Sequence, residues 1–179
     1  MFPDNPLSLA AGAVFTILLL WAAYGDLRNR RIPNRLVVII ALLGISYSVV
    51  AGRALPGLES SFGGMATGLV CWLPFYVLGW LGAGDVKMFA AAGAWLGPVK
   101  ALEGSLVAAL IGAILALLWM LRVKGIRNSL ETLTLATGSP GVLSNSANKT
   151  ETSRGTLPYG IAMAAGALWA AWLPLFPLR

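Results

Sequence analysis

Long apolar runs separated by short polar segments dominate this chain. The runs cover about Leu7–Gly25, Leu36–Ala51, Phe62–Leu81, Val86–Leu96, Gly104–Leu121 and Leu157–Phe176. Several approach or exceed the ~18–20 apolar residues that a helix needs to cross a hydrocarbon core of about 30 Å. The runs lack the alternation of a β-strand, so helices are the spanning element that the pattern supports. We predict an all-α fold: a polytopic membrane bundle of about six transmembrane helices, forming a single domain over residues 1–179.

Composition narrows the chemistry that such a bundle can carry. Hydrophobic residues make up 58% of the chain and charged residues only 11%, whereas soluble domains contain roughly 25% charged residues. The first run has no basic segment before it, so we expect a retained span and not a cleaved signal peptide. The chain has no histidine and a single cysteine, Cys71. A Ser-His or Cys-His pair, a histidine metal site and a Cys-x-x-Cys site are therefore excluded, and we expect no metal and no cofactor.

The basic residues predict an orientation. Those in the segments after the first, third and fifth runs are Arg28, Arg30, Arg31, Arg35, Lys87, Arg122, Lys124, Arg127, Lys149 and Arg154. The remaining three are Arg53, Lys100 and Arg179. By the positive-inside rule the larger group faces the cytoplasm and both termini face outside. The net charge of +6 is thus interpreted as a topology signal, and no nucleic-acid partner is expected because no aromatic-interleaved basic platform accompanies it.

The long segment 122–156 has a mixed character. Its second half is rich in Ser, Thr, Asn and Gly, which predicts a flexible cytoplasmic loop. Its first half spaces Ile126, Leu130 and Leu133 as a helix would. A short helix on the inner leaflet and an unstructured loop are the two alternatives for that half.

Two of the seven acidic residues stand apart from the others. Five are interpreted as solvated charges in the tail and loops: Asp4, Glu59, Glu103, Glu131 and Glu151. Asp26 lies at the inner end of the first run, and Asp85 begins the fourth. Asp85 alone is compatible with a simple helix cap. Asp26 sits at a helix C-terminus, where the helix dipole disfavours a carboxylate unless a nearby arginine compensates.

The fourth run is too short to span the membrane alone. From Val86 to Gly97 it covers roughly 18 Å at ~1.5 Å per residue, less than the hydrocarbon thickness. Either its outer end re-enters the membrane, or Asp85 and the preceding turn lie below the lipid surface. Gly82 and Gly84 fit a tight turn there, with no side chains to obstruct an approaching peptide.

Two carboxyl groups at one depth predict an aspartyl dyad. Carboxyls that share a site cannot both ionise easily, so the pair holds one proton. The charged member takes a proton from water as the water attacks a peptide carbonyl, and the neutral member donates to the developing oxyanion. The helix ends predict that Asp85 is the charged member and Asp26 the protonated one.

Short motifs around both aspartates resemble a known family. GAGD at residues 82–85 fits the GxGD signature of intramembrane aspartyl proteases, and GDLRNRRIPN at 25–34 resembles the first-aspartate motif of the type IV prepilin peptidases. GDVKM at 84–88 is similar to their second motif, and PYG at 158–160 matches the start of their last span, especially in short Flp/tight-adherence-type members. This resemblance implies a bacterial inner-membrane endopeptidase that removes the short leader of prepilins or pseudopilins at the cytoplasmic face. It implies catalytic roles for Asp26 and Asp85, with Gly82 and Gly84 as the supporting turn.

The resemblance says less about the remaining positions. Lys87 and Asn34 are candidates for supporting the aspartates, although Lys87 also fits an interfacial lysine and Asn34 a helix cap. Larger family members carry an extra N-terminal portion with paired cysteines, associated with N-methylation of the cleaved pilin. Because this sequence offers only Cys71, we expect a peptidase without methyltransferase activity.

Three alternatives remain open. A presenilin-type protease would carry Pro-Ala-Leu where Pro158-Tyr159-Gly160 stands. A small ion or proton transporter could use the two acids as a relay, but it would predict inverted halves, and no such repeat is visible. An inactive scaffolding homologue is the third alternative. The expected partners are a prepilin substrate and the lipid bilayer, and the sequence specifies neither the pilin nor an oligomeric state.

Overall fold

The computed structural model describes residues 6–29, 32–51, 54–138 and 159–173. The helices within these ranges are α1 (Pro6–Asn29), α2 (Asn34–Ala51), α3 (Leu55–Val77), α4 (Ala83–Gly138) and α6 (Tyr159–Trp172). No strand occurs among the described residues, which confirms the all-α prediction. Contacts divide the chain into two compact units, Met1–Gly112 with Pro158–Arg179, and Ala113–Leu157. The first unit contains both aspartates.

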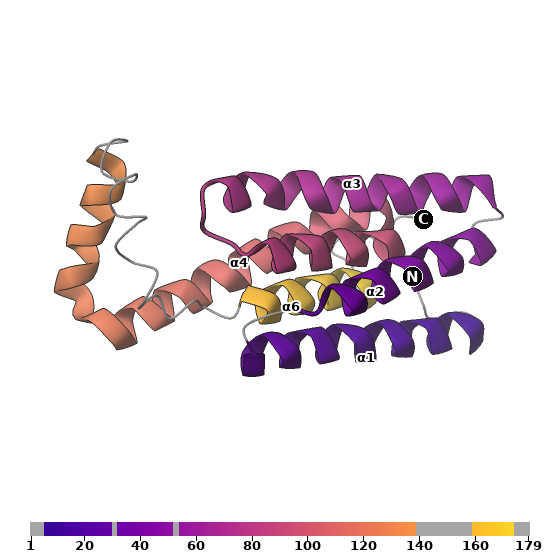
Figure 1. Cartoon of the computed structure of the whole chain (residues 1–179), viewed down its shortest axis with the longest axis horizontal. Coiled ribbons are helices and arrows are strands. Elements are labelled where there is room, and N and C mark those ends of the chain that lie inside the picture. The colour runs from indigo at the N-terminus through magenta and orange to yellow at the C-terminus, as the bar shows by residue number, and fades with distance from the viewer. Residues whose placement is uncertain (1–5, 30–31, 52–53, 139–158, 174–179) are drawn as a thin grey trace. The chain divides into compact units, whose positions relative to one another are not determined.

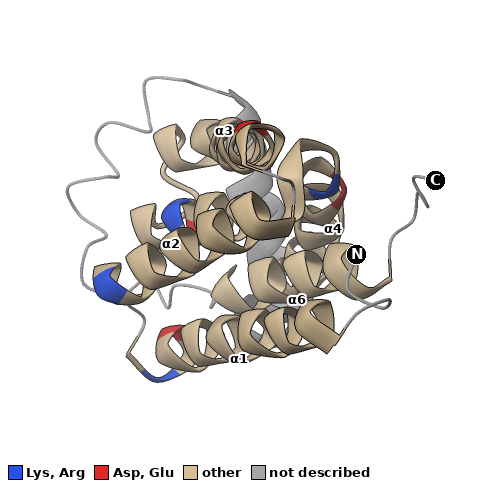
Figure 2. Cartoon of the chain, turned by 90° about the vertical axis from the view of Figure 1, so that its right-hand side faces the viewer, with Lys and Arg blue, Asp and Glu red and all other residues tan. Residues whose placement is uncertain are grey.

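Within the first unit the helices run side by side (Figure 1). Seen end-on in Figure 2, α3 and α2 are neighbours, and α6 and α1 are neighbours. The contacts agree with this view, because α1 packs mainly on α6 and α2 mainly on α3, with fewer contacts between α1 and α2. Charged residues colour only short stretches of these ribbons.

Helix α4 reverses its direction at Gly97, which has a φ of 72°. Asp85 lines a pocket together with Asp26, near the end of α1. A Cβ atom added to Gly97 would meet Ser60, near the start of α3, and one added to Gly112 would meet Tyr159 at the start of α6. The helix therefore runs away from the pocket to Gly97 and returns beside α6 (Figure 1).

The reversal at Pro98 is stabilised by hydrogen bonds from neighbouring helices. Proline has no N–H, so Pro98 cannot donate to the carbonyl of Ala94 four residues earlier. Two hydroxyls from neighbouring helices donate to that carbonyl instead, Ser48 Oγ at 3.0 Å and Ser61 Oγ at 2.9 Å. Both serines are buried. The turn therefore keeps its freed carbonyl satisfied inside the bundle, as a buried or lipid environment requires.

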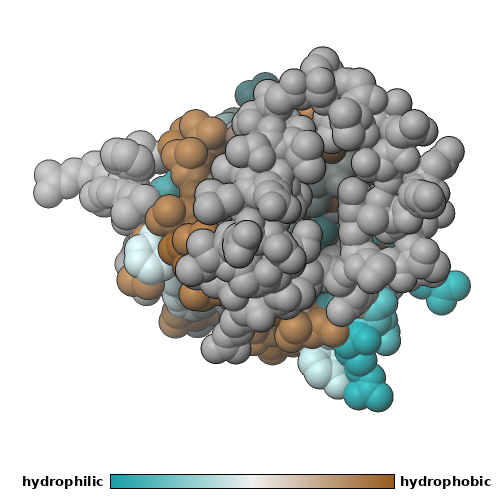
Figure 3. Space-filling model, turned by 90° about the vertical axis from the view of Figure 1, so that its left-hand side faces the viewer, coloured by the Kyte–Doolittle hydropathy of each residue, from teal (hydrophilic) through white to brown (hydrophobic). Residues whose placement is uncertain are grey.

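The surface of the bundle is strongly apolar. Ile17, Trp21 and Val70 are 61%, 63% and 67% exposed, whereas Phe15 and Phe89 are fully buried. In Figure 3, hydrophobic residues, coloured brown, cover much of the visible surface that is not grey. By length and composition, three of the described helices could cross a membrane, namely α1, α2 and the part of α4 up to Leu118, and α6 is a shorter apolar helix. The chain is therefore a helical membrane protein, and six spans with both termini outside stay predictions.

Several predicted boundaries differ from the structure. The predicted spans Val86–Leu96 and Gly104–Leu121 belong to the single helix α4, which continues to Gly138. For the first half of segment 122–156 the helix is the alternative observed, because α4 includes residues 122–138. The flexible loop predicted for the rest of the segment falls on residues 139–156, which lie outside the described part of the chain. Helix α3 begins at Leu55 and not at Phe62, because Pro56 falls in its first turn, where a missing N–H costs no hydrogen bond.

The interpretation of Glu103 as a solvated loop charge is also wrong. Glu103 lies within α4 and is only 4% exposed. The neighbouring Gly104 packs against Gly166 and Ala170 of α6, so tertiary packing covers this part of the chain. Glu59 is exposed as expected, but it lies in helix α3 and not in a loop.

Candidate active site

The first carboxylate comes from the last turn of α1. Asp26 lies three residues before Asn29, where α1 ends, and its side chain is only 8% exposed. Its Oδ2 accepts a hydrogen bond of 3.0 Å from the backbone amide of Gly160, the second residue of α6. A carboxylate at a helix C-terminus faces the negative end of the helix dipole. The positive end of α6 therefore supplies a compensating donor.

The second carboxylate is placed by a sharp turn between α3 and α4. Trp80 N donates to Phe75 O and Gly79 N to Tyr76 O, each at 2.9 Å, and Gly79 has a φ of 73°. These two bonds form a Schellman motif, which requires a left-handed residue such as glycine at this position. The rings of Phe75 and Trp80 lie 6.0 Å apart, which adds the hydrophobic contact typical of the motif. The chain thus stops α3 abruptly and starts α4 within five residues.

Gly82 begins the next helix as its N-cap. The carbonyl of Gly82 accepts hydrogen bonds from the amides of Asp85, at 3.1 Å, and Val86, at 3.4 Å. Asp85 is therefore the third residue of α4, and the interpretation of Asp85 itself as the cap is wrong. Its carboxylate folds back over the turn: the Gly82 amide is a hydrogen-bond donor to it. A Cβ on Gly82 would lie 3.4 Å from Asp85 Oδ2.

The two aspartates line one pocket of about 240 Å³. Its lining residues come from the ends of α1, α2 and α4 and are Asp26, Ile32, Asn34, Gly82, Ala83, Gly84, Asp85 and Lys87. The structure therefore brings together all six residues that the sequence singled out. The two carboxyl groups are near enough to interact electrostatically, and the assignment of the shared proton to Asp26 stays a prediction.

The start of α2 closes one side of this pocket. Pro33 O accepts hydrogen bonds from the amides of Leu36, at 3.0 Å, and Val37, at 3.3 Å. Pro33 is thus the N-cap of α2, and the expectation that Asn34 caps the helix is wrong. Asn34 is exposed and lines the pocket. Ile32 is buried, and its Cβ would lie 3.6 Å from a Cβ on Gly84, so the segment before α2 packs on the first turn of α4.

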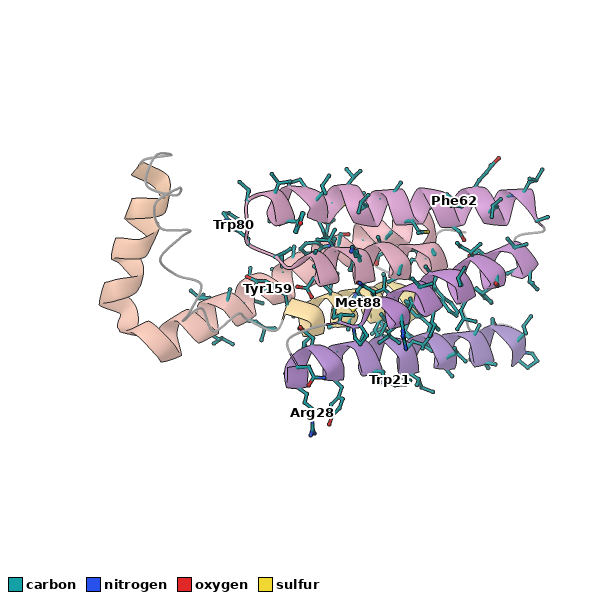
Figure 4. The ribbon with its side chains drawn as sticks, viewed as in Figure 1. Trp21, Arg28, Phe62, Trp80, Met88 and Tyr159 are labelled. Atoms are coloured by element: carbon teal, nitrogen blue, oxygen red, sulfur yellow. The ribbon has the colours of Figure 1, made fainter. Side chains whose placement is uncertain are left out.

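Sequence reasoning missed the contribution of Gly160. It considered a nearby arginine as one way to compensate Asp26, and in the structure Arg28 Nη1 donates at 3.2 Å to the hydroxyl of Tyr24 on the exposed side of α1. The Pro158-Tyr159-Gly160 motif was noted in the sequence, but the donor is a backbone amide. Side-chain types alone cannot indicate such a donor. In Figure 4, Arg28, Trp80 and Tyr159 lie toward the same end of the bundle, and Phe62 lies toward the other.

This arrangement is suited to acid–base chemistry. Two carboxyls in one small pocket share a proton more easily than both ionise. One can then accept a proton while the other donates, within a single bound substrate. Among the described residues no group of three His, Cys, Asp or Glu side chains could hold a metal ion.

Comparison with known proteins gives a family match over the part of the chain that contains the pocket residues. Residues 13–117, which include both aspartates, match the type IV leader peptidase family. The prepilin leader peptidase/N-methyltransferase of Aeromonas salmonicida (strain A449) is 32% identical over 121 residues, which cover 60% of this chain and 41% of the relative. The protein of the same name from Pectobacterium carotovorum is 30% identical over 119 residues, covering 63% and 41%. A third, from Xanthomonas campestris, is 33% identical over 117 residues, covering 61% and 40%.

The similarity covers only part of each chain. The chain spans about two fifths of the length of the curated relatives that it matches. No solved structure gives a significant match. The family match covers more than half of the chain and contains the pocket residues from α1, α2 and α4. The chain belongs to the type IV leader peptidase family.

Proposed function

We propose that this chain is an aspartyl endopeptidase that removes the short leader of prepilins or pseudopilins at the cytoplasmic face of the bacterial inner membrane. One observation carries the proposal: Asp26 and Asp85, 59 positions apart in the sequence, line the same pocket. The family and the names of the relatives, prepilin leader peptidase/N-methyltransferase, support the substrate class. Methyl transfer is not part of the proposal.

The first chemical step adds water to the scissile peptide bond. The ionised aspartate accepts a proton from a water molecule as the water oxygen bonds to the carbonyl carbon. The protonated aspartate donates its proton to the carbonyl oxygen, so a neutral gem-diol forms and no oxyanion is left unpaired. The dyad has then exchanged the position of its single proton.

The second step breaks the carbon–nitrogen bond. The aspartate that gained a proton from water gives it to the departing nitrogen, which becomes the new amino terminus of the mature pilin. One hydroxyl of the gem-diol returns its proton to the other aspartate, and the leader leaves with a free carboxyl end. The dyad regains its starting state, so a single proton suffices for repeated turnover.

The pocket walls suit an extended peptide backbone. Gly82 and Gly84 carry no side chains beside Asp85, so a substrate backbone can approach the carboxylate closely. The apolar flank of the bundle continues from this end, and an apolar pilin helix would remain in lipid while its leader junction enters the pocket. The inner-membrane setting thereby explains why the site lies at helix ends.

The test is leader removal from a co-expressed prepilin, followed by gel shift. Asp26→Asn and Asp85→Asn should each reduce cleavage by about 10²–10⁴-fold or more, since each removes a proton-transfer group. Glu59→Gln, at an exposed position on α3, is the matched control and should cleave normally. Normal processing by either aspartate variant would refute the proposal. A proton or ion transporter would instead show altered flux in proteoliposomes and no effect on the pilin.

A further inference from the structure

Asp26 needs a hydrogen-bond donor because of where it lies. It is 8% exposed, and a buried polar group without a donor costs roughly 1–3 kcal/mol. Its own helix cannot supply one, because the last turn of a helix presents carbonyl oxygens and not amides. The backbone amide of Gly160, 134 positions away in the sequence, donates to Oδ2 at 3.0 Å.

The backbone amide of Gly160 is available as a hydrogen-bond donor because Gly160 lies in the first turn of α6. Helix α6 begins at Tyr159, so Gly160 is its second residue. The first four amides of a helix have no acceptor within the helix, and the dipole makes this end attractive to a negative charge. An unsatisfied donor and a buried acceptor therefore satisfy each other across two helices.

Only glycine leaves room for this contact. A Cβ at position 160 would lie 2.7 Å from Asp26 Oδ2, 2.9 Å from its Cβ and 3.0 Å from its Cγ. Two of these atoms are at the base of the aspartate side chain, which cannot swing away as a flexible end would. Even a methyl group at this position would therefore displace the carboxylate or the start of α6.

The start of α6 is itself held in place. A Cβ on Gly112 would lie 3.3 Å from the ring of Tyr159, and one on Gly166 would lie 2.5 Å from Ala108 Cβ. Gly104 also packs on Gly166, because a Cβ on Gly104 would lie 3.1 Å from the carbonyl oxygen of Gly166. Since α6 is packed against the returning part of α4, a displacement at position 160 would fall mainly on Asp26.

We propose that Gly160 is a positioning residue for Asp26, and this inference rests on the proposed peptidase function. Its amide and its missing side chain together fix the carboxylate of Asp26 toward Asp85. The Pro158-Tyr159-Gly160 motif thereby acts on the reaction through the first carboxylate, without touching the substrate. The family match ends at residue 117, so it assigns no role to this position.

The first arm of the test uses purified full-length protein in proteoliposomes with a fluorogenic peptide that spans a prepilin leader junction. Gly160→Ala should lower kcat by about 10²-fold, since misplacing a catalytic group by about 1 Å costs that much, while KM changes less than threefold. Gly63→Ala is the matched control, because its Cβ would meet Pro98 at an ordinary 3.6 Å. An unchanged kcat in Gly160→Ala, or an equal loss in Gly63→Ala, would overturn the proposal.

A second variant separates the amide from the steric effect and avoids any folding defect from an added methyl group. Cell-free translation with glycolic acid at position 160 replaces the amide by an ester, which removes the donor without adding a side chain. The ester also weakens the adjoining carbonyl as an acceptor, so an ester at a neighbouring position serves as the control. The ester at position 160 should lose about tenfold in kcat, whereas an ester at Ile161, the next position of the same turn, should lose less than threefold. Equal losses in the two esters would overturn the role of the Gly160 donor.

A third experiment measures how readily the Asp26 carboxyl group reacts with a chemical label, and it does not require cleavage. Dicyclohexylcarbodiimide labels accessible protonated carboxyls, and mass spectrometry maps the sites. Gly160→Ala should change the labelling rate of Asp26 at least threefold relative to Glu59, which is exposed on α3. An unchanged ratio would overturn the positioning role. If Gly160→Ala changes the labelling ratio but the wild-type chain cleaves no prepilin peptide, the proposed function fails, and the result supports only the structural part of the inference, that Gly160 places the Asp26 carboxyl.

Discussion

The turn of α4 at Pro98 offers a quantitative test of how the bundle is held together. The carbonyl of Ala94 lacks a backbone donor because Pro98 has no N–H, and it accepts from Ser48 Oγ and Ser61 Oγ at 3.0 and 2.9 Å. The perturbation is the replacement of each serine by alanine, singly and together. Each replacement removes one hydroxyl and adds no new group.

The free energy of unfolding should respond non-additively. Interhelical hydrogen bonds in membrane proteins average about 0.6 kcal/mol, with a maximum of about 1.7 kcal/mol. Ser48→Ala or Ser61→Ala alone leaves the carbonyl one donor, so each should cost about 0.6 kcal/mol. The double variant leaves a buried carbonyl with neither hydroxyl, which costs about 1–3 kcal/mol for the unsatisfied group. We therefore expect the double variant to exceed the sum of the single ones by about 1 kcal/mol.

The assay is reversible unfolding in mixed detergent micelles with increasing dodecyl sulfate, followed by circular dichroism. Ser46→Ala is the matched control, because Ser46 Oγ donates at 2.8 Å to Leu42 O within its own helix on an exposed face. It should cost less than about 0.5 kcal/mol, as surface substitutions usually do. A double variant that is no less stable than the sum of the singles would refute the reasoning about the freed carbonyl.

Two further predictions concern packing and the pocket. Gly64→Ala and Gly93→Ala should each destabilise the bundle by about 1–3 kcal/mol or more, because a Cβ on either residue would fall on the backbone carbonyl of the other. Gly63→Ala is the control and should be neutral or stabilising in the same unfolding assay. Equal effects at Gly63 and Gly64 would contradict this prediction. Lys87→Gln should lower kcat/KM less than about fivefold, because Lys87 is exposed and even a paired exposed charge contributes only roughly 0.2–1 kcal/mol. A loss above fiftyfold in the peptide assay would show that Lys87 takes part in the chemistry.

The sequence predicted the helices better than their connections. Long apolar runs indicate helices almost without regard to context, since lipid leaves no other way to satisfy the backbone. The predicted spans Val86–Leu96 and Gly104–Leu121 left residues 97–103 as a connection between two separate helices. In the structure the helical run continues through it, because Ser48 and Ser61 on other helices satisfy what proline leaves open. No local pattern contains that information.

The candidate site was also only partly predictable from the sequence. Asp26, Gly82 and Asp85 could be singled out because carboxylates are rare in this chain and the glycines flank one of them. The donor to Asp26 could not, because it is a backbone amide whose usefulness depends on where α6 begins. Glu103 was misjudged for a related reason: it is buried beside Gly104, which packs on α6, and a linear sequence does not display such tertiary packing.

The pocket is surrounded by helix ends, and this arrangement governs its electrostatics. The N-terminal ends of α2 and α4 line the pocket through Asn34 and Gly82, and the N-terminal end of α6 reaches Asp26 through the Gly160 amide. Among the described residues that line the pocket, Asp26 of α1 comes from a C-terminal helix end. Three positive helix ends against one negative end favour the charge of a singly ionised dyad with fixed backbone dipoles that need no reorganisation. Exposed cations contribute little beside them, because water and salt screen exposed charges. The backbone at Gly160 should therefore matter more to turnover than the ammonium group of Lys87, and a Lys87→Gln variant that lost more activity than Gly160→Ala would show that side-chain charge and not helix geometry controls the dyad.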